Sequence, residues 1–316
     1  MRTYFLYFCF ITGIVLSAQN NTPRIFKLQE RAVTKKIQKY LHHDTIIETQ
    51  QAFIHINYSN DPKKPYLLLL HGMGVDAKTN WFKQVAYLSR YYNLLMPDLV
   101  YFGKSRAKET NYSVEFQVEQ IHEAIRKIIS KEKISVMGFS YGGLTTAMYN
   151  EIYPGEVNKL VIIDGPVKFF SIEMADSLAK IAGVESMTSI IVPQTLSDFS
   201  AMQKAVLSKK YPATRKLKRK LIAHYFSPTL KSRQLQLSYL SSHQSAYQNY
   251  NYNLDKTPTL LIWGKKDGVV PVYVGEKLHA SYPGTTRLII YKKAKHDTHF
   301  RCAKKLNKAV ISFLKN

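Results

Sequence analysis

Cysteine is scarce in this sequence, since the 316 residues include only Cys9 and Cys302. Cys9 lies inside an apolar segment near the N-terminus, so a chain that loses this segment keeps Cys302 alone. A single thiol cannot form an internal disulfide. A scaffold stapled by disulfides is therefore excluded, and the folded state must depend on a buried hydrophobic core.

Acidic side chains are also few, with 22 Asp and Glu against 45 Lys and Arg, which gives a formal net charge of +23. Two basic runs stand out, at 209–220 and 292–305. Neither carries a zinc-finger spacing, an RNA-recognition signature or a basic-zipper heptad, so we expect no specific nucleic-acid binding. The excess charge instead favours contact with anionic surfaces such as lipid headgroups or cell-envelope polymers.

Long apolar runs are missing as well. The first apolar run of the chain, Tyr4–Leu16, follows one arginine and precedes the small residues Ser17 and Ala18. This layout is typical of a secretory signal peptide, and the run is too short to span a bilayer comfortably. We expect residues 1–18 to be cleaved and the protein to be periplasmic or secreted. The alternative is a retained N-terminal membrane anchor.

Short apolar runs alternate with helical patterns along the rest of the chain. Residues 52–58 alternate like a strand with one buried face, whereas 66–72 is a continuous run, as in a strand buried on both faces. Further strands are predicted at 93–99, 134–138, 159–164, 259–264 and 286–291. This alternation predicts an α/β domain with a mostly parallel central sheet and helices on both faces.

One long stretch between predicted strands, 167–255, has helical spacing and no convincing strand. It is too long for a loop and too poor in strands for another strand–helix–strand unit. We interpret it as a helical cap inserted into the sheet domain. The core then has two parts, 19–166 and 256–316.

The sharpest motif is Gly138-Phe-Ser140-Tyr-Gly142, which lies between a predicted strand and a predicted helix. G-x-S-x-G in this context is the nucleophile elbow, where a strained turn exposes the serine hydroxyl. Side chains two positions before and after the serine would collide with it, hence the glycines. Ser140 is therefore the candidate nucleophile, and the alternative is an ordinary strand-to-helix turn.

An oxyanion needs two backbone N–H donors from different segments. Residue Tyr141 follows the serine, and Met73 follows His71-Gly72 at the end of the strand 66–72. We expect the amides of Met73 and Tyr141 to be the two donors. His71 is expected to orient its loop and not to act as a base.

The acid of a serine triad in this chain order lies between the serine and the histidine. Asp267 follows a predicted strand and is the first choice. Asp164, at the end of the strand 159–164, is the alternative. Asp98 precedes the serine and is expected to be a structural turn residue.

The candidate base is His296, on the loop after the last predicted strand. A helix follows, with Asp297 or Thr298 as a plausible N-cap, so His299 falls in its first turn. His299 either lines the pocket or has no role. A metal site built from His296, Asp297 and His299 is disfavoured because no further ligand cluster is evident, so we expect no metal and no cofactor.

Over residues 45–316 these motifs together resemble the α/β-hydrolase superfamily, and most of all its branch of monoacylglycerol-lipase-like proteins and esterases. The matching segments are LLLLHGMG, PDLVYFGKS, VMGFSYGG, YPGEVNKLVIIDGP and LLIWGKKDGVVP, with the terminal histidine loop. The resemblance implies a helical cap inserted after the sixth strand. It also implies Ser140 as nucleophile, His296 as base, Asp267 as its orienter, and Met73 and Tyr141 as oxyanion donors.

The chain departs from the family pattern at two positions. Relatives often read D-x-P-G-x-G-x-S where this chain has Asp98-Leu-Val-Tyr-Phe-Gly-Lys-Ser105, which places Tyr101 at a glycine position. Relatives also usually carry glycine before the histidine, where this chain has Lys295. We expect both loops to differ locally from those of the family.

The expected activity is hydrolysis of small-molecule carboxylic esters, lipid-like acyl esters such as monoacylglycerols in particular, through an acyl-enzyme. The same triad also serves amide or C–C bond hydrolysis, because the fold does not fix the leaving group. Two further readings are a ligand-binding protein without turnover and a surface adhesion module that uses the basic faces.

Overall fold

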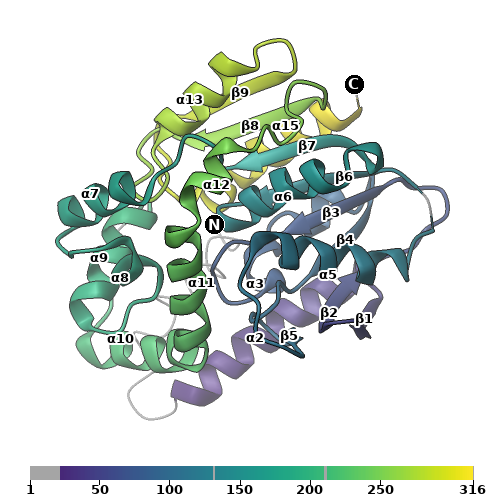
Figure 1. Ribbon diagram of the computed structural model, residues 1–316. Coiled ribbons are helices and arrows are strands. Elements are labelled where there is room, and N and C mark those ends of the chain that lie inside the picture. The colour runs from purple at the N-terminus through teal and green to yellow at the C-terminus, as the bar shows by residue number, and fades with distance from the viewer. Residues whose placement is uncertain (1–21, 131, 210–211, 316) are drawn as a thin grey trace.

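The computed structural model describes residues 22–130, 132–209 and 212–315, and a nine-stranded sheet runs through the centre of the chain (Figure 1). The expected signal peptide, residues 1–18, lies outside the described residues. The strands are β1 (His43–Glu48), β2 (Ala52–Tyr58), β3 (Tyr66–Leu70), β4 (Asn93–Pro97), β5 (Arg106–Ala107), β6 (Ile134–Phe139), β7 (Val157–Ile163), β8 (Thr259–Gly264) and β9 (Thr286–Tyr291).

The strand order is β1-β2-β4-β3-β6-β7-β8-β9, and β5 pairs with β2. All neighbours from β4 to β9 pair in parallel, whereas β2 pairs antiparallel with β1, β4 and β5. This confirms the predicted mostly parallel sheet. The central strands β3, β4 and β6 are buried along their whole length, as their unbroken apolar runs indicate.

Helices cover both faces of the sheet, and the alternation of side chains along β3 shows how. Leu68 and Leu70 belong to one hydrophobic cluster with residues of α5 (Val114–Arg126), α6 (Tyr141–Ile152) and α13 (Val272–Ser281). The intervening leucines belong to a second cluster, which includes residues of α3 (Ala77–Trp81), α4 (Val85–Leu88) and α15 (Ala303–Lys315). Successive side chains point to opposite faces of a strand, so one apolar strand supports two helical layers.

The segment between β7 and β8 is helical. It forms the cap, residues 167–255, which lies to one side of the sheet in Figure 1. Its helices are α7 (Ile172–Ala182), α8 (Met187–Ile191), α9 (Leu196–Val206), α10 (Arg215–Leu221), a π-helix (Ile222–Phe226), a 3₁₀ turn (Ser227–Thr229), α11 (Leu230–Ser242) and α12 (Gln244–Asn249). The cap follows the seventh strand of the structure, whereas the family resemblance implied the sixth. The apolar patterns in the sequence predict five of these seven strands and miss β1 and the two-residue β5.

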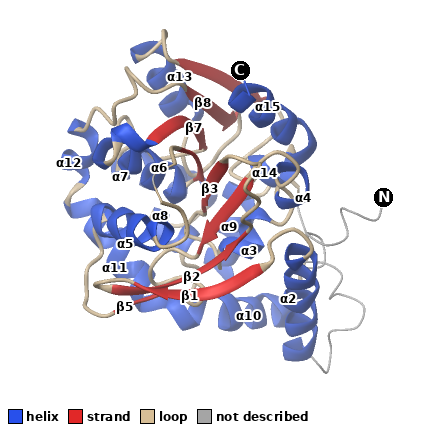
Figure 2. Cartoon of the chain, turned by 90° about the vertical axis from the view of Figure 1, so that its right-hand side faces the viewer, coloured by secondary structure: helices blue, strands red, loops and turns tan. Residues whose placement is uncertain are grey.

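The N-terminal helix α2 (Thr22–Gln38) was not predicted from the sequence. Its residue Phe26 is buried in a cluster with Leu217 and Tyr225 of the cap, while Val33 and Ile37 pack into the core cluster of the sheet. One helix therefore joins the cap to the sheet domain, as Figure 2 shows from the side. No helix in the described part of the chain is both long and apolar enough to cross a bilayer.

Candidate active site

Ser140 occupies the turn between β6 and α6, with φ 55° and ψ −124°. A positive φ is strained for a residue with a side chain, and this turn depends on close backbone contacts around it. A Cβ on Gly138 would lie 2.0 Å from the Gly142 carbonyl oxygen, and one on Gly142 would lie 2.1 Å from the Leu70 carbonyl oxygen. The spacing of the glycines in the motif is therefore explained by the packing of the turn.

The side chains of Ser140, His296 and Asp267 form a continuous hydrogen-bond chain. The His296 Nε2 atom lies 2.8 Å from the Ser140 Oγ, and its Nδ1 lies 2.7 Å from Asp267 Oδ2. A carboxylate accepts the Nδ1 proton, which leaves Nε2 free to accept from the serine hydroxyl. Asp267 is held in turn by its Oδ1, which accepts the amides of Val269 and Val270 at 2.8 and 2.9 Å.

Asp164, the alternative acid, lies beside this chain without joining it. Its Oδ1 accepts the Gly264 amide at 2.9 Å. Burial, together with the nearby Asp267 carboxylate, raises the pKa of Asp164 well above its usual range. Asp267, and not Asp164, is the acidic residue that contacts His296.

Asp164, Asp267 and His296 each offer one ligand atom, and these atoms lie within 4.8 Å of one another. A metal ion there would need the histidine nitrogen and the carboxylate oxygens. The hydrogen bond between His296 Nδ1 and Asp267 Oδ2 already occupies one such nitrogen and one such oxygen, so a bound ion that used these two atoms would have to displace it.

The two amides expected to bind an oxyanion come from two segments that meet at Ser140. Tyr141 begins α6, and Met73 follows Gly72, where an added Cβ would lie 3.0 Å from the Ser140 Cβ. Among the described residues, neither amide donates a hydrogen bond to another protein atom. Both donors are therefore available beside the serine, as an oxyanion requires.

His71 stabilises the loop that carries Met73 through hydrogen bonds at both ring nitrogens. Its Nδ1 lies 2.7 Å from the Gly72 carbonyl oxygen, and its Nε2 accepts the Leu99 amide at 2.9 Å. Complete burial lowers the pKa of His71, which keeps the ring neutral with one donor and one acceptor nitrogen. The geometry agrees with the orienting role expected for this residue.

Asp98 also holds loops in place and does not approach the serine hydroxyl. Its carboxylate accepts the amides of Ala77 and Lys104 at 2.9 and 3.0 Å, and it contacts His55 Nδ1 at 2.7 Å. Tyr101, at the position where relatives carry glycine, has φ 74°. The backbone thus keeps the left-handed conformation that glycine would favour, at the cost of local strain.

The second departure, Lys295, connects the histidine loop to the cap. The Lys295 amide donates to Ser208 Oγ at 3.0 Å, and Asp297 Oδ2 accepts the Ser208 amide at 3.0 Å. Asp297 is the N-cap residue of α14 (Thr298–Arg301), but its carboxylate makes no capping hydrogen bond. Its side chain contacts the cap instead, a role that sequence spacing did not indicate.

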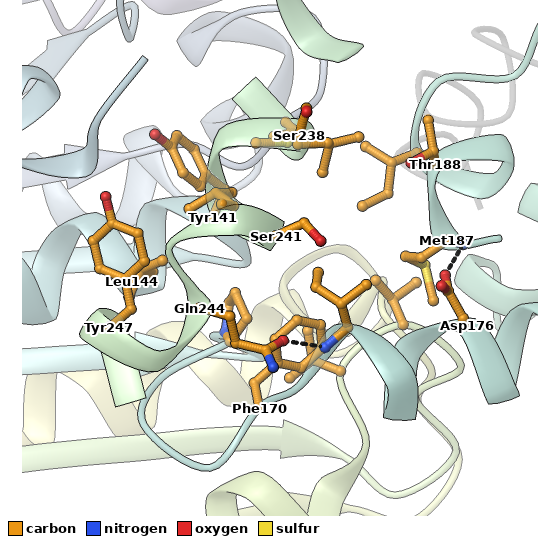
Figure 3. A pocket seen from close by; sticks show the side chains of 18 of the residues that line it. Tyr141, Leu144, Phe170, Asp176, Met187, Thr188, Ser238, Ser241, Gln244 and Tyr247 are labelled. Atoms are coloured by element: carbon orange, nitrogen blue, oxygen red, sulfur yellow. Dashed lines mark hydrogen bonds between the residues drawn. The ribbon is translucent and has the colours of Figure 1, made fainter. Parts of the chain in front are cut away.

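A cavity of about 460 Å³ opens at Ser140 between the sheet domain and the cap (Figure 3). Ser140, Tyr141 and Leu144 line its base. The cap contributes apolar side chains such as Met187 and Leu237 together with the polar Ser238, Ser241 and Gln244. The site can therefore enclose an elongated, largely apolar molecule next to the serine hydroxyl.

A smaller cavity of about 190 Å³ also reaches Ser140, and it alone of the two is lined by His296. His299 and Asn80 also line this second cavity. Within the described structure, both ring nitrogens of His299 and the Asn80 Nδ2 are buried and lack a hydrogen-bond partner. Asn80 was missed in the sequence, where it is an ordinary polar residue before a tryptophan.

His299 is completely buried, and its ring packs against Phe139 with centroids 3.8 Å apart. Burial, with further contributions from His296 and Lys83, holds the pKa of His299 well below its usual range. The ring is therefore neutral. Of the two sequence readings, the structure supports a residue that lines the pocket.

A serine on a strand-to-helix turn, joined to a histidine and an aspartate and faced by two open amides, defines a class of hydrolases. The chain belongs to the α/β hydrolase fold family, whose model matches residues 65–301.

Three comparisons illustrate the relatives of this chain. It is 23% identical to the human monoacylglycerol lipase ABHD6 over 281 residues, which cover 87% of the chain and 81% of the relative. It is 24% identical to the 2-hydroxy-6-oxo-6-(2'-aminophenyl)hexa-2,4-dienoic acid hydrolase of Metapseudomonas resinovorans, with coverage of 71% and 75%. A putative lipase of Acinetobacter baumannii has the same fold, with a TM-score of 0.76, 19% identity and coverage of 90% and 95%.

The different roles of Asp267 and Asp164 can be tested by substituting each carboxyl group in turn. Asp267→Asn should slow the labelling of Ser140 by a fluorophosphonate by up to about 10⁴-fold, because the amide no longer selects the histidine tautomer that accepts from the serine. Asp164→Asn should leave the labelling rate nearly unchanged, since the asparagine carbonyl can still accept the Gly264 amide and Asp164 forms no hydrogen bond with His296 in the described structure. Labelling rates measured by mass spectrometry would contradict the assignment if Asp164→Asn were the slower variant.

Proposed function

We propose that this protein is a serine hydrolase that cleaves carboxylic esters with a lipid-like acyl group. The observation that carries the proposal is the hydrogen-bond chain from Ser140 through His296 to Asp267, at the point where an apolar cavity meets the serine hydroxyl. The sequence similarity to a monoacylglycerol lipase supports the same substrate class.

In the proposed mechanism, His296 Nε2 accepts the proton of the Ser140 hydroxyl while Oγ attacks the ester carbonyl. The amides of Met73 and Tyr141 stabilise the negative charge on the carbonyl oxygen, each contributing about 10²–10³-fold in rate. The C–O bond breaks as the His296 imidazolium returns its proton to the leaving alcohol. A water molecule, activated by the same nitrogen, then hydrolyses the acyl-enzyme.

The two cavities suggest how an ester is oriented. The leaving alcohol must lie beside the imidazole that protonates it, and His296 lines the smaller cavity. The acyl chain then occupies the larger cavity under the cap. The unpartnered nitrogens of His299 and Asn80 supply a donor and an acceptor for hydroxyl groups on the alcohol, so a polyhydric alcohol such as glycerol is the leaving group that we propose.

A second candidate is hydrolysis of a C–C bond in a dienoic acid, which the similarity to the Metapseudomonas hydrolase favours. The same serine, histidine and oxyanion amides would serve that reaction. A panel of esters and dienoic acids at equal concentration separates the two candidates. Turnover of the acids without turnover of the esters would support the second.

We also propose contact with an anionic membrane surface, through a patch that we call the basic face. Two neighbouring helices carry it, α2 with Lys27 and Arg31, and α10 with Arg215 and Arg219. All four side chains are exposed. Leu28, between the first two, is 60% exposed, so an apolar group accompanies the charge.

The reaction itself is tested by substitution. Ser140→Ala and His296→Ala should each reduce p-nitrophenyl ester turnover to background, because one removes the attacking atom and the other removes the proton acceptor. His299→Ala should retain most of the turnover of this substrate, whose leaving group has no hydroxyl for it to contact. Wild-type activity at background, with no fluorophosphonate labelling, would instead support a binding protein.

A substitution at His299 tests the proposed binding site for the leaving alcohol. His299→Phe keeps an aromatic ring against Phe139 but removes both nitrogens. We expect it to lower kcat/KM for a glyceryl monoester by about tenfold, the value of one lost hydrogen bond to a buried group, and to leave the ethyl ester of the same acid unchanged. An equal loss for both esters would mean that His299 only supports the fold.

Membrane contact is measured by co-sedimentation with vesicles. The protein should bind vesicles that contain phosphatidylglycerol and not pure phosphatidylcholine vesicles, with binding lost at high salt. Lys27→Glu with Arg31→Glu should weaken this binding more than Lys292→Glu with Lys293→Glu, an exposed pair elsewhere on the molecule. If both pairs weakened vesicle binding equally, net charge alone would explain the binding, and the basic face would not be a specific docking surface.

A further inference from the structure

The cap contains a buried arginine that the proposed reaction does not use. Arg233 of α11 is 1% exposed, and no carboxylate among the described residues forms an ion pair with it. Burial lowers the pKa of Arg233 to about 10, so the guanidinium is still charged at neutral pH. A buried cation without a counter-charge is costly for folding, which calls for an explanation.

The guanidinium lies between the cap and the loop that carries the proposed oxyanion donor. Its Nη2 donates to the Gly74 carbonyl oxygen and, at 3.4 Å, to the Tyr225 carbonyl oxygen. The rings of Phe102, from the sheet domain, and Phe226, from the cap, lie 5.4 and 5.5 Å from its central carbon. One side chain therefore contacts both parts of the chain through charge-assisted and cation–π interactions.

An irregular helix builds the cap side of this contact. Tyr225 and Phe226 both belong to the π-helix Ile222–Phe226, which interrupts the path from α10 to α11. A π-helix is rare and is often found at functional positions because it redirects groups that an α-helix would place elsewhere. Here it presents a carbonyl oxygen and an aromatic ring to the same guanidinium.

The contacted carbonyl belongs to the turn around Met73. The Gly74 amide donates to the Gly72 carbonyl oxygen at 2.7 Å, which closes a tight turn with Met73 at its centre. His71 holds the same Gly72 oxygen from the other side. Apart from its chain neighbours, Gly74 has no atom within 4 Å of the position where a Cβ would lie, so packing around this position does not restrain it. The hydrogen bond from Arg233 to its carbonyl oxygen is therefore an important restraint on its orientation.

We propose that Arg233 is a positioning residue, which sets the orientation of the Met73 amide through its hydrogen bond to Gly74 and so makes the oxyanion site depend on the closed position of the cap. The inference rests on the proposed function, in which that amide stabilises the reaction's negative charge. Gln236, one turn further along α11, makes a parallel contact from its Nε2 to the Val100 carbonyl oxygen at 3.4 Å. The inner face of α11 thus holds two loops of the sheet domain.

The test compares Arg233→Met, which keeps the length and apolar stem, with Arg233→Lys, which keeps the charge but not the planar fork. Lys231→Met, at an exposed lysine on the same helix α11, is the matched control. For each variant we would measure kcat and KM on a p-nitrophenyl ester after active-site titration, the affinity for a trifluoromethyl ketone, and unfolding in urea. The ketone forms an oxyanion on the serine and so reports the amides directly.

For Arg233→Met we expect kcat to fall about 10–100-fold, the ketone affinity to fall by a similar factor, and KM to change little, because only the charge-stabilising step is affected. Arg233→Lys should restore part of the loss. Stability should change little, since a buried unpaired charge has been replaced by an apolar chain. Lys231→Met should match the wild type in all measurements.

Other outcomes overturn the inference. A raised KM with unchanged kcat would make Arg233 a substrate contact, and a loss of titratable sites with normal kcat per site would make it a purely structural residue. If wild-type protein cleaves no ester but binds the ketone, the proposed function fails while the ketone affinities of the variants still decide the role of Arg233. If it binds neither, both fail.

Discussion

The site depends on one tight backbone junction. The strained turn at Ser140 exists because β3, β6 and α6 approach so closely that Gly138 and Gly142 leave no room for a side chain. The same closeness brings Gly72, and with it the Met73 amide, next to the serine. A central sheet of parallel strands with buried faces is what holds these segments at such distances, so the geometry of the reaction centre follows from the packing of the sheet.

Two acidic residues at the ends of adjacent strands illustrate how environment separates similar groups. Asp164 follows β7 and Asp267 follows β8, and both carboxyl groups are buried near His296. Asp267 accepts two backbone amides and contacts the imidazole of His296. Asp164 is fully buried, and burial together with the neighbouring Asp267 raises the pKa of Asp164 well above its usual range. The ends of two adjacent strands thus give two acidic residues different surroundings, and only one of the two contacts the histidine.

Much of this was predictable from the sequence, and the exceptions have physical causes. Continuous apolar runs and the glycine spacing around Ser140 identify the parallel sheet and the turn, because they follow from burial and close approach. The sequence favours Asp267 over Asp164, but both follow a strand, and only the tertiary contact with His296 distinguishes them. Arg233 and Asn80 carry no local pattern, because their significance lies in atoms brought from distant segments.

The pairing of β7 with β8 has a consequence for how such a protein can diversify. The cap leaves the sheet after one of these strands and returns before its direct neighbour, with Ile163 opposite Ile262. Because these strands are parallel, the cap begins at the carboxyl end of β7 and returns at the amino end of β8. It can be lengthened, shortened or exchanged as a cassette without reordering the strands, provided that the new segment still spans the sheet from one edge to the other. A transplanted cassette would succeed only if it also supplied a donor to the Gly74 carbonyl and a partner for Asp297, which limits the modular freedom of the design.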